Sequence, residues 1–181
     1  MPQNAIAGRS VRAIAARTAD LANLVRDPAC TPGDVAAVLR NHGETDPHIT
    51  PSDVADLRTA AERLRAVLTA PDADGAAAAV NRLLAATAHP PRLTSHGGTT
   101  HWHLHVDTHD DAPWAEWFTT SACLVFALLI TDRQRPPGGV CASPSCGLVF
   151  VDAGSGSPRR YCSRRCATRE RVAAHRVRTR G

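Results

Sequence analysis

The stretch Cys141-Ala-Ser-Pro-Ser-Cys146, followed after a gap of fifteen residues by Cys162-Ser-Arg-Arg-Cys166, decides how the end of this sequence folds. Two close pairs of cysteines with a hairpin-sized gap are typical of zinc sites, because each pair can bind one ion and the gap lets the second pair fold back onto the first. Four thiolates close a tetrahedral shell, whereas a catalytic zinc needs an open position. We therefore predict one structural Zn²⁺ per chain, held by Cys141, Cys146, Cys162 and Cys166.

Short elements are expected around these cysteines. They are a knuckle at 141–147, a strand at 148–151, a hairpin turn at 152–157, a return strand at 159–161 and a helix from 163 to about 178. A knuckle, a hairpin and a helix in this order predict a treble-clef-like zinc finger. In the final helix, Val172, Ala173 and Val177 are expected to pack inward, and the zinc ion is expected to supply most of the folding energy of so small a module.

The charge is divided unevenly along the chain. Residues 1–140 carry twelve Arg against fifteen acidic residues, whereas residues 141–181 carry nine Arg against two, a net charge of +7. A basic segment on a zinc finger, beside an acidic body, indicates a polyanionic partner. The side chains expected to contact a nucleic acid are Arg159, Arg160, Arg164, Arg165, Arg169, Arg171, Arg176 and Arg178.

Duplex DNA is the partner that these arginines favour, with most guanidinium groups on phosphates and one or two on guanine edges. Two alternatives remain open. One is RNA, although the finger has only Phe150 and Tyr161 on which single-stranded bases could stack. The other is an acidic protein surface, in which case the zinc ion only builds a scaffold for protein interaction without direct DNA binding.

Residues 1–139 are expected to form a mainly helical domain. Thr31-Pro-Gly-Asp34 and Thr50-Pro-Ser-Asp53 share one helix-starting pattern, in which Thr caps a free N–H, Pro takes the first helical position and Asp favours the positive end of the helix dipole. Apolar periodicity predicts helices over 1–26, from 32 to about 42, over 51–68, over 73–88 and over 114–131. The last is the most apolar and is expected at the centre of the core.

The loop over 132–139 is rich in Pro and Gly and is expected to be the linker that separates this domain from a finger over 140–181. The two helices that begin after Thr31 and Thr50 do not favour a helix-turn-helix motif. The connection from His42 to Thr50 is too long for the usual tight turn, and neither helix has an Arg-rich face.

A β-hairpin is predicted near 92–107, with its turn at Gly97-Gly98. His101, His103 and His105 would share one face of its second strand, opposite Trp102, Leu104 and Val106. Three such histidines are either the polar face of a half-exposed strand or a ligand or second-metal site, which His109 could complete. The strand spacing is wide for three ligands of one ion, so the polar face is the favoured interpretation.

Cysteine usage and apolar runs indicate a cytoplasmic protein. The N-terminal residues lack the apolar core of a signal peptide, and the run 123–130 is too short to span a bilayer, so no membrane partner is expected. Reduced thiols favour a metal over disulfides. Cys30 and Cys123 are isolated and are expected to be small buried residues.

Several stretches carry a family resemblance. In the C-terminal part they are Cys146-Gly147, Phe150-Val-Asp152, Arg160-Tyr-Cys-Ser163, Cys166-Ala-Thr-Arg169 and Val172-Ala-Ala-His-Arg176. This part resembles the CGNR zinc-finger family, which is named for a Cys-Gly-Asn-Arg stretch. Here the stretch is Cys166-Ala-Thr-Arg169, so the Cys and the Arg match the motif and the Gly and the Asn do not. The N-terminal part is similar to the ABATE-type domain usually found before this finger, through Leu21-Ala-Asn-Leu24, Thr31-Pro-Gly-Asp34, Ile49-Thr-Pro-Ser-Asp-Val-Ala-Asp-Leu57, Val80-Asn-Arg-Leu-Leu84 and His103-Leu-His105.

The resemblance implies a stress-induced bacterial transcription regulator whose N-terminal domain senses a ligand or mediates an interaction. Together with the residue patterns it predicts an α+β fold, in which a helical domain with a small hairpin precedes a four-cysteine finger. We expect a zinc-dependent, DNA-binding transcriptional regulator and no enzyme activity. An unidentified small-molecule effector and a homodimer are further expectations for the N-terminal domain.

Overall fold

Two capping boxes start neighbouring helices of the N-terminal part in the computed structural model, which describes residues 11–154 and 156–179. Helix α2 (Pro32–Asn41) and helix α3 (Pro51–Leu68) each follow a capping Thr whose side chain accepts a hydrogen bond from the Asp three residues on. The carboxylate of that Asp accepts a hydrogen bond from the Thr backbone N–H, at 2.9 Å for Thr31 and 2.8 Å for Thr50. Both predicted helix starts are confirmed.

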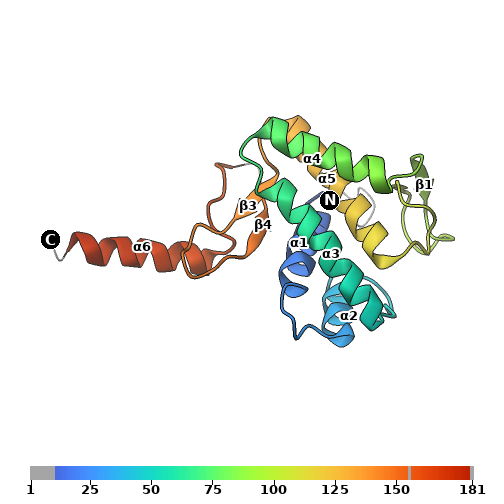
Figure 1. Ribbon diagram of the computed structural model, residues 1–181, viewed down its shortest axis with the longest axis horizontal. Coiled ribbons are helices and arrows are strands. Elements are labelled where there is room, and N and C mark those ends of the chain that lie inside the picture. Colours follow the sequence, from blue (N-terminus) through green and yellow to red (C-terminus); the bar gives the residue numbers. More distant parts are fainter. Residues whose placement is uncertain (1–10, 155, 180–181) are drawn as a thin grey trace, which may run out of the picture.

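Helix α5 (Trp114–Arg133) lies at the centre of the core, as predicted from its apolar composition. It packs against α3, α4 (Ala73–Thr87) and α1 (Val11–Leu24), and Figure 1 shows α4 lying along it. Its Phe118 and Phe126 are fully buried. The first ten residues of the helix expected over 1–26 lie outside the described residues.

The apolar run 123–130 is part of this twenty-residue helix. The segment to compare with the thickness of a bilayer is therefore longer than the run that the sequence suggested. By length and composition alone, α5 could cross a membrane, but half of its apolar stretch is buried inside the protein. Such burial is what the core helix of a folded domain shows.

The predicted hairpin is present, with strands shorter than expected. Strand β1 (Arg92–Thr94) pairs antiparallel with β2 (His103–His105), and Leu93 lies opposite Leu104. The histidine face of β2 was expected to be the face exposed to solvent, but the structure turns it toward the protein. Leu104 is 49% exposed, whereas His105 is only 7% exposed and turns toward the protein.

The strand pairing in the finger differs from the prediction. Strand β4 (Val149–Val151) pairs with β3 (Gly138–Val140), which precedes the cysteine knuckle, and residues 159–161 form no strand. Part of the expected linker is therefore strand β3, and the expected domain boundary between 139 and 140 falls inside it. Gly138 makes the pairing feasible, because a Cβ there would lie 2.0 Å from the Phe150 carbonyl oxygen.

Strand β4 also joins the finger to the helical core. Val149 and Val151 are buried in the same apolar cluster as the helices, and β4 contacts both α1 and α3. The Asn23 side chain on α1 hydrogen-bonds both backbone groups of Val149, donating to its carbonyl at 2.9 Å and accepting from its N–H at 2.8 Å.

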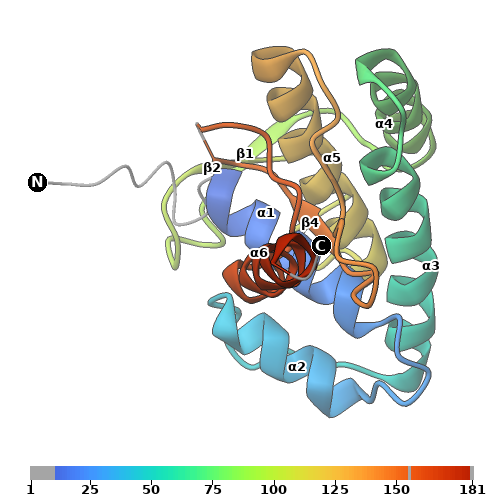
Figure 2. The same cartoon turned by 90° about the vertical axis from the view of Figure 1, so that its left-hand side faces the viewer.

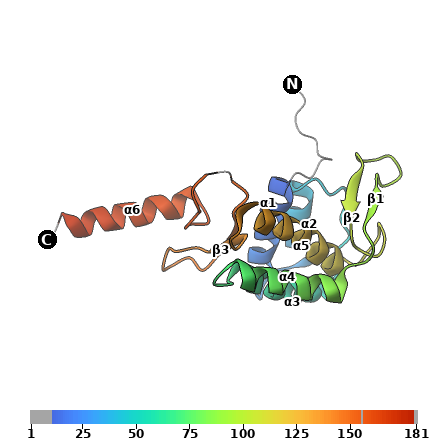
Figure 3. The ribbon, with the colours of Figure 1, turned by 90° about the horizontal axis from the view of Figure 1, so that it is seen from above.

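Helix α6 (Arg164–Arg178) projects away from the rest of the protein, at the end opposite the β1–β2 hairpin (Figures 1 and 3). Viewed along its length, it stands in front of α1 and β4 (Figure 2). Cys166 is its one buried residue. The predicted inward packing of Val172, Ala173 and Val177 is wrong, since all three are exposed and Val177 is 74% exposed.

Candidate metal centre

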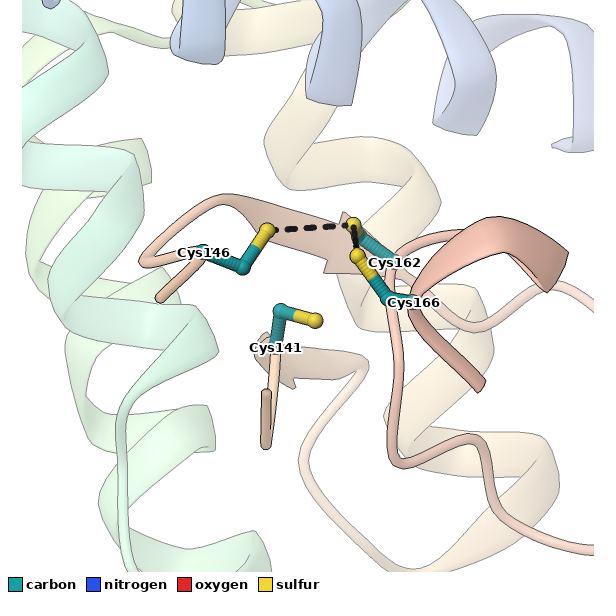
Figure 4. Close-up of side chains that lie close together, drawn as sticks. All are labelled: Cys141, Cys146, Cys162 and Cys166. Carbon is teal, nitrogen blue, oxygen red and sulfur yellow. Dashed lines mark hydrogen bonds between the residues drawn. The ribbon is translucent and has the colours of Figure 1, made fainter. Parts of the chain in front are cut away.

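Four cysteine sulfurs converge at the junction of the knuckle and α6 (Figure 4). The Sγ atoms of Cys141, Cys146, Cys162 and Cys166 all lie within 4.8 Å of one another. Cys162 Sγ is 3.5 Å from Cys146 Sγ and 3.7 Å from Cys166 Sγ. Four sulfurs placed about 2.3 Å from one zinc ion at tetrahedral angles are separated by about 3.8 Å, so the observed spacing fits the ion.

The first cysteine pair is positioned by the turn between β3 and β4. The Cys141 N–H donates to the Leu148 carbonyl at 2.8 Å, and the Cys146 N–H donates to the Ser143 carbonyl at 2.9 Å. Gly147 then has a φ of +65°, a left-handed conformation that side chains rarely adopt. This reversal directs the chain from the knuckle into β4.

The second pair is positioned by the start of α6. Ser163 caps the helix, and its Oγ accepts a hydrogen bond from the Cys166 N–H at 3.3 Å. Cys162 stands just before the cap and Cys166 in the first turn, so the spacing of four residues brings both sulfurs to one side, as predicted. The unpaired N–H groups of a helix start also favour a thiolate nearby.

Backbone hydrogen bonds stabilise negative charge on one sulfur of the group. Burial alone would raise the pKa of the Cys141 thiol, but hydrogen bonds from the backbone of Cys162 and Ser143 outweigh it and lower the pKa to about 7. Burial and the neighbouring cysteine side chains have the opposite effect on Cys162, whose pKa they raise to about 12. Four sulfurs at this spacing cannot all be anionic without a cation between them, and a divalent ion supplies that charge.

A polar cluster that the sequence did not reveal braces the metal centre. The Arg169 guanidinium lies 3.6 Å from Cys166 Sγ and also donates to Ser143 Oγ. Ser143, which is 1% exposed, donates in turn to the Glu170 carboxylate. These contacts link the knuckle to α6 beside the sulfurs, and they give Glu170, the one acidic residue of α6, a structural role. Hydrogen bonds around a metal centre orient the ligands that bind the ion.

The donor set therefore fits one Zn²⁺, which would hold α6 against the knuckle. One comparison with protein families covers this site, and a second covers the N-terminal part. The profile of the CGNR zinc finger matches residues 139–179. The profile of the ABATE family, described as "Putative stress-induced transcription regulator", matches residues 11–133, more than half of the chain.

The chain belongs to the ABATE family. The resemblance read from its sequence is thereby confirmed for both parts. The two family descriptions are those of a transcription regulator and a zinc finger, and neither names an enzyme. Comparison with curated proteins gives no match.

The eight arginines expected to contact nucleic acid fall into two groups in this ABATE protein. Arg159 donates to the carbonyls of Val151, Tyr161 and Cys162, so its side chain braces the finger. Arg169 is held at the metal centre. The other six are exposed and make few contacts with described residues; they are Arg160, Arg164, Arg165, Arg171, Arg176 and Arg178.

The hairpin histidines that lie together are not the three that strand alternation predicts. His103 and His105 lie beside His96, a residue of the β1–β2 loop that no sequence pattern indicates. His101 and His109 are exposed and are not members of this group. No periodicity could have indicated His96, because the loop fold rather than strand alternation brings it to the other two.

Proposed function

We propose that this ABATE-family protein is a cytoplasmic transcription regulator that binds duplex DNA through α6 and the adjoining part of its finger. The observation that carries the proposal is the exposure of α6. A fifteen-residue helix with six arginines and one acidic residue stands clear of the protein with only Cys166 buried. Of these six arginines only Arg169 braces the metal centre. The other five are exposed side chains that folding does not require, and a dense cation cluster of this kind fits a polyanion.

The dimensions of α6 support DNA as that polyanion. Fifteen helical residues span about 22 Å, and a helix with its side chains fits the major groove, which is about 12 Å wide. Arg164 and Arg165 lie at the end near the zinc centre, and Arg176 and Arg178 at the other. None of these four guanidinium groups has a hydrogen-bond partner or an ion pair within the described residues, so each is available to phosphate or guanine. The order of knuckle, strand and helix supports a treble-clef-like finger as the platform.

The first test is the salt dependence of DNA binding by the full chain loaded with zinc. Six of the eight arginines, Arg160 and the arginines of α6 other than Arg169, brace neither the finger nor the metal centre. If each contacts a phosphate, the logarithm of the association constant should fall with the logarithm of salt concentration with a slope of about −5. Fluorescence anisotropy with a random duplex measures the slope. Affinity that is undetectable or independent of salt would rule out the proposal.

Matched variants locate the contact. Arg176→Ala/Arg178→Ala should weaken binding and reduce the steepness of the salt slope by about 2, since two phosphate contacts are lost. Arg63→Ala/Arg82→Ala removes the same charge from exposed positions on α3 and α4 and should leave the slope nearly unchanged. Equal effects of the two double variants would mean that binding follows net charge and not α6.

A protein partner is the second candidate, and the exposed valines of α6 favour it. Val172 is 42% and Val177 is 74% exposed on a helix that is otherwise mainly polar and charged. Apolar side chains exposed on a projecting helix can enter a groove of another protein. Pull-down of partners in the presence of nuclease separates the two candidates, because a partner held through nucleic acid is lost and a direct protein contact survives.

A further inference from the structure

A second cluster of metal-ligating side chains lies in the hairpin, at the end of the molecule opposite α6 (Figures 1 and 3). The rings of His96, His103 and His105 have centroids 4.8 to 5.3 Å apart. One ring nitrogen from each comes within 4.8 Å of the others, and His96 Nε2 lies 3.1 Å from His103 Nε2. Three ring nitrogens this close together can serve as ligands of one metal ion.

Two of the rings are oriented by partners on the nitrogen that faces away from the cluster. His105 Nδ1 lies 2.9 Å from Asp107 Oδ1, and His103 Nδ1 lies 2.8 Å from the carbonyl oxygen of His101. The His101 carbonyl can only accept, so His103 Nδ1 carries the proton. His105 Nδ1 has the Asp107 carboxylate at 2.9 Å and the Arg92 guanidinium, a donor, at 3.4 Å; the closer partner is an acceptor, so this Nδ1 is assigned the proton as well. The lone pair is then on Nε2, the arrangement that metal-binding histidines adopt when a carboxylate or carbonyl fixes the ring.

The third histidine is placed by an unusual backbone. His96 has a φ of +47°, a left-handed conformation that is uncommon for residues other than glycine, and Gly97 and Gly98 follow with positive φ. The loop conformation directs the imidazole to the other two rings, and His96 Nδ1 lies 3.5 Å from Asp110 Oδ2. Backbone strain of this kind occurs at sites that bind ligands.

Negative charge beside the cluster favours a cation. Arg92 forms ion pairs with the buried Asp107 and the exposed Asp110, so these three groups carry a net charge of −1 next to the three rings. Asp107 is only 3% exposed. A buried carboxylate hydrogen-bonded to His105 is a typical outer partner of a metal-bound imidazole.

We propose that His96, His103 and His105 bind a divalent transition-metal ion, Zn²⁺ or a metal of similar ligand preference, through their Nε2 atoms. Two nitrogens about 2.1 Å from one zinc ion at a tetrahedral angle lie about 3.4 Å apart, close to the observed 3.1 Å between His96 and His103. His105 offers a ring nitrogen within 4.8 Å of those of the other two histidines. Three imidazoles leave the fourth position to water or a small ligand.

The site has an entry path. His103 and His105 also line a groove of about 790 Å³ between α1, β2 and α5, and the His96 side chain is 26% exposed. An ion can therefore reach the rings from solvent without unfolding of the hairpin. This site does not depend on the four-cysteine centre or on DNA binding, and it gives the N-terminal part a ligand-binding role of its own.

Zinc and cobalt binding to the full chain test the proposal. Elemental analysis after equilibration with Zn²⁺ and removal of loosely bound ion should give two zinc ions per chain for the unchanged protein. His96→Gln and His103→Gln should each give one. His101→Gln removes an exposed neighbouring histidine outside the cluster and should keep two. In the cobalt-loaded protein, the charge-transfer bands of thiolate ligation should persist in all four proteins.

The persistent thiolate bands show that a variant has kept its fold and its cysteine centre, so a lost second ion cannot be attributed to unfolding. Added Zn²⁺ should also raise the unfolding temperature of the unchanged protein, with the cysteine centre already filled, and should not raise that of His96→Gln. One ion per chain in the unchanged protein, or two in both cluster variants, would overturn the proposal and leave the histidines as a hydrogen-bonded group.

Discussion

At the scale of single residues, Asn23 shows how one side chain connects the two parts that the sequence suggested were separate. Its amide satisfies both the N–H and the carbonyl of Val149 on β4, as a neighbouring strand would. Arg26 adds a hydrogen bond to the Gly147 carbonyl at 2.8 Å. The edge of β4 is therefore capped by side chains of α1 and its C-terminal extension, and no further strand is needed there.

Replacement of this amide should weaken the whole fold. We expect Asn23→Ala to lower the free energy of unfolding by about 2 kcal/mol, because two partly buried backbone groups lose their partners. Urea denaturation followed by circular dichroism measures the change. Asn81→Ala, at an exposed position on α4, should be neutral or slightly stabilising. If the two variants behave alike, Asn23 does not link the finger to the helices.

At the scale of elements, the predictable parts are those with local signals. The Thr-Pro-x-Asp starts of α2 and α3 are complete within four residues, and the cysteine pairs need only their own spacing. The sequence does not indicate strand β3, because Gly138-Gly139 is usual turn composition. The role of Gly138, close approach of two strands, depends on Phe150, twelve residues further along the chain. The return strand at 159–161 was wrong because Arg159 braces the finger with its side chain in place of a strand ladder.

Gly138 provides the sharpest test of this pairing. A Cβ at Gly138 would lie 2.0 Å from the Phe150 carbonyl oxygen and 2.8 Å from the Leu68 side chain. Gly138→Ala should therefore separate β3 from β4 and destabilise the protein by about 3 kcal/mol. Zinc content should also fall, since β3 leads directly into Cys141. Gly156→Ala, where no atom lies within 4 Å of the new methyl group, is the control and should change neither quantity.

The histidine cluster shows the same limit of sequence information. His103 and His105 could be assigned to one strand face from alternation alone, and the structure keeps them together. His96 joins them through a loop with three consecutive positive φ values, which no residue periodicity encodes. The sequence also suggested the wrong solvent face, because buried Asp107 and half-buried Arg92 satisfy the polar side of the strand and the leucines face outward.

At the scale of the whole molecule, the finger and the helices share one core. Val149 and Val151 are buried among residues of α1 and α3, so metal-dependent folding of the finger bears on the stability of the rest. Removal of zinc should withdraw β4 from this core and expose both valines at a cost of about 4 kcal/mol. For a chain of this size that loss corresponds to about 10 °C in the unfolding temperature of the helical part.

Differential scanning calorimetry with and without a chelator measures this coupling. Cys162→Ser should reproduce the effect of the chelator, whereas Cys30→Ser, which lies outside the metal centre, should retain both the zinc and the unfolding temperature. An unchanged unfolding temperature of the helices after zinc removal would show instead that the finger is an independent module.

The exposure of α6 bears on how this protein can diverge. Because Cys166 is the one buried residue of the helix, most of its other positions can mutate with little penalty in folding stability. Apart from Arg169 and Glu170, which contact the knuckle, the arginines of α6 and their neighbours can therefore change step by step, without compensating changes elsewhere in the chain. Paralogues arising by gene duplication could acquire separate targets through substitutions confined to α6, while the helical core and the cysteines stayed the same.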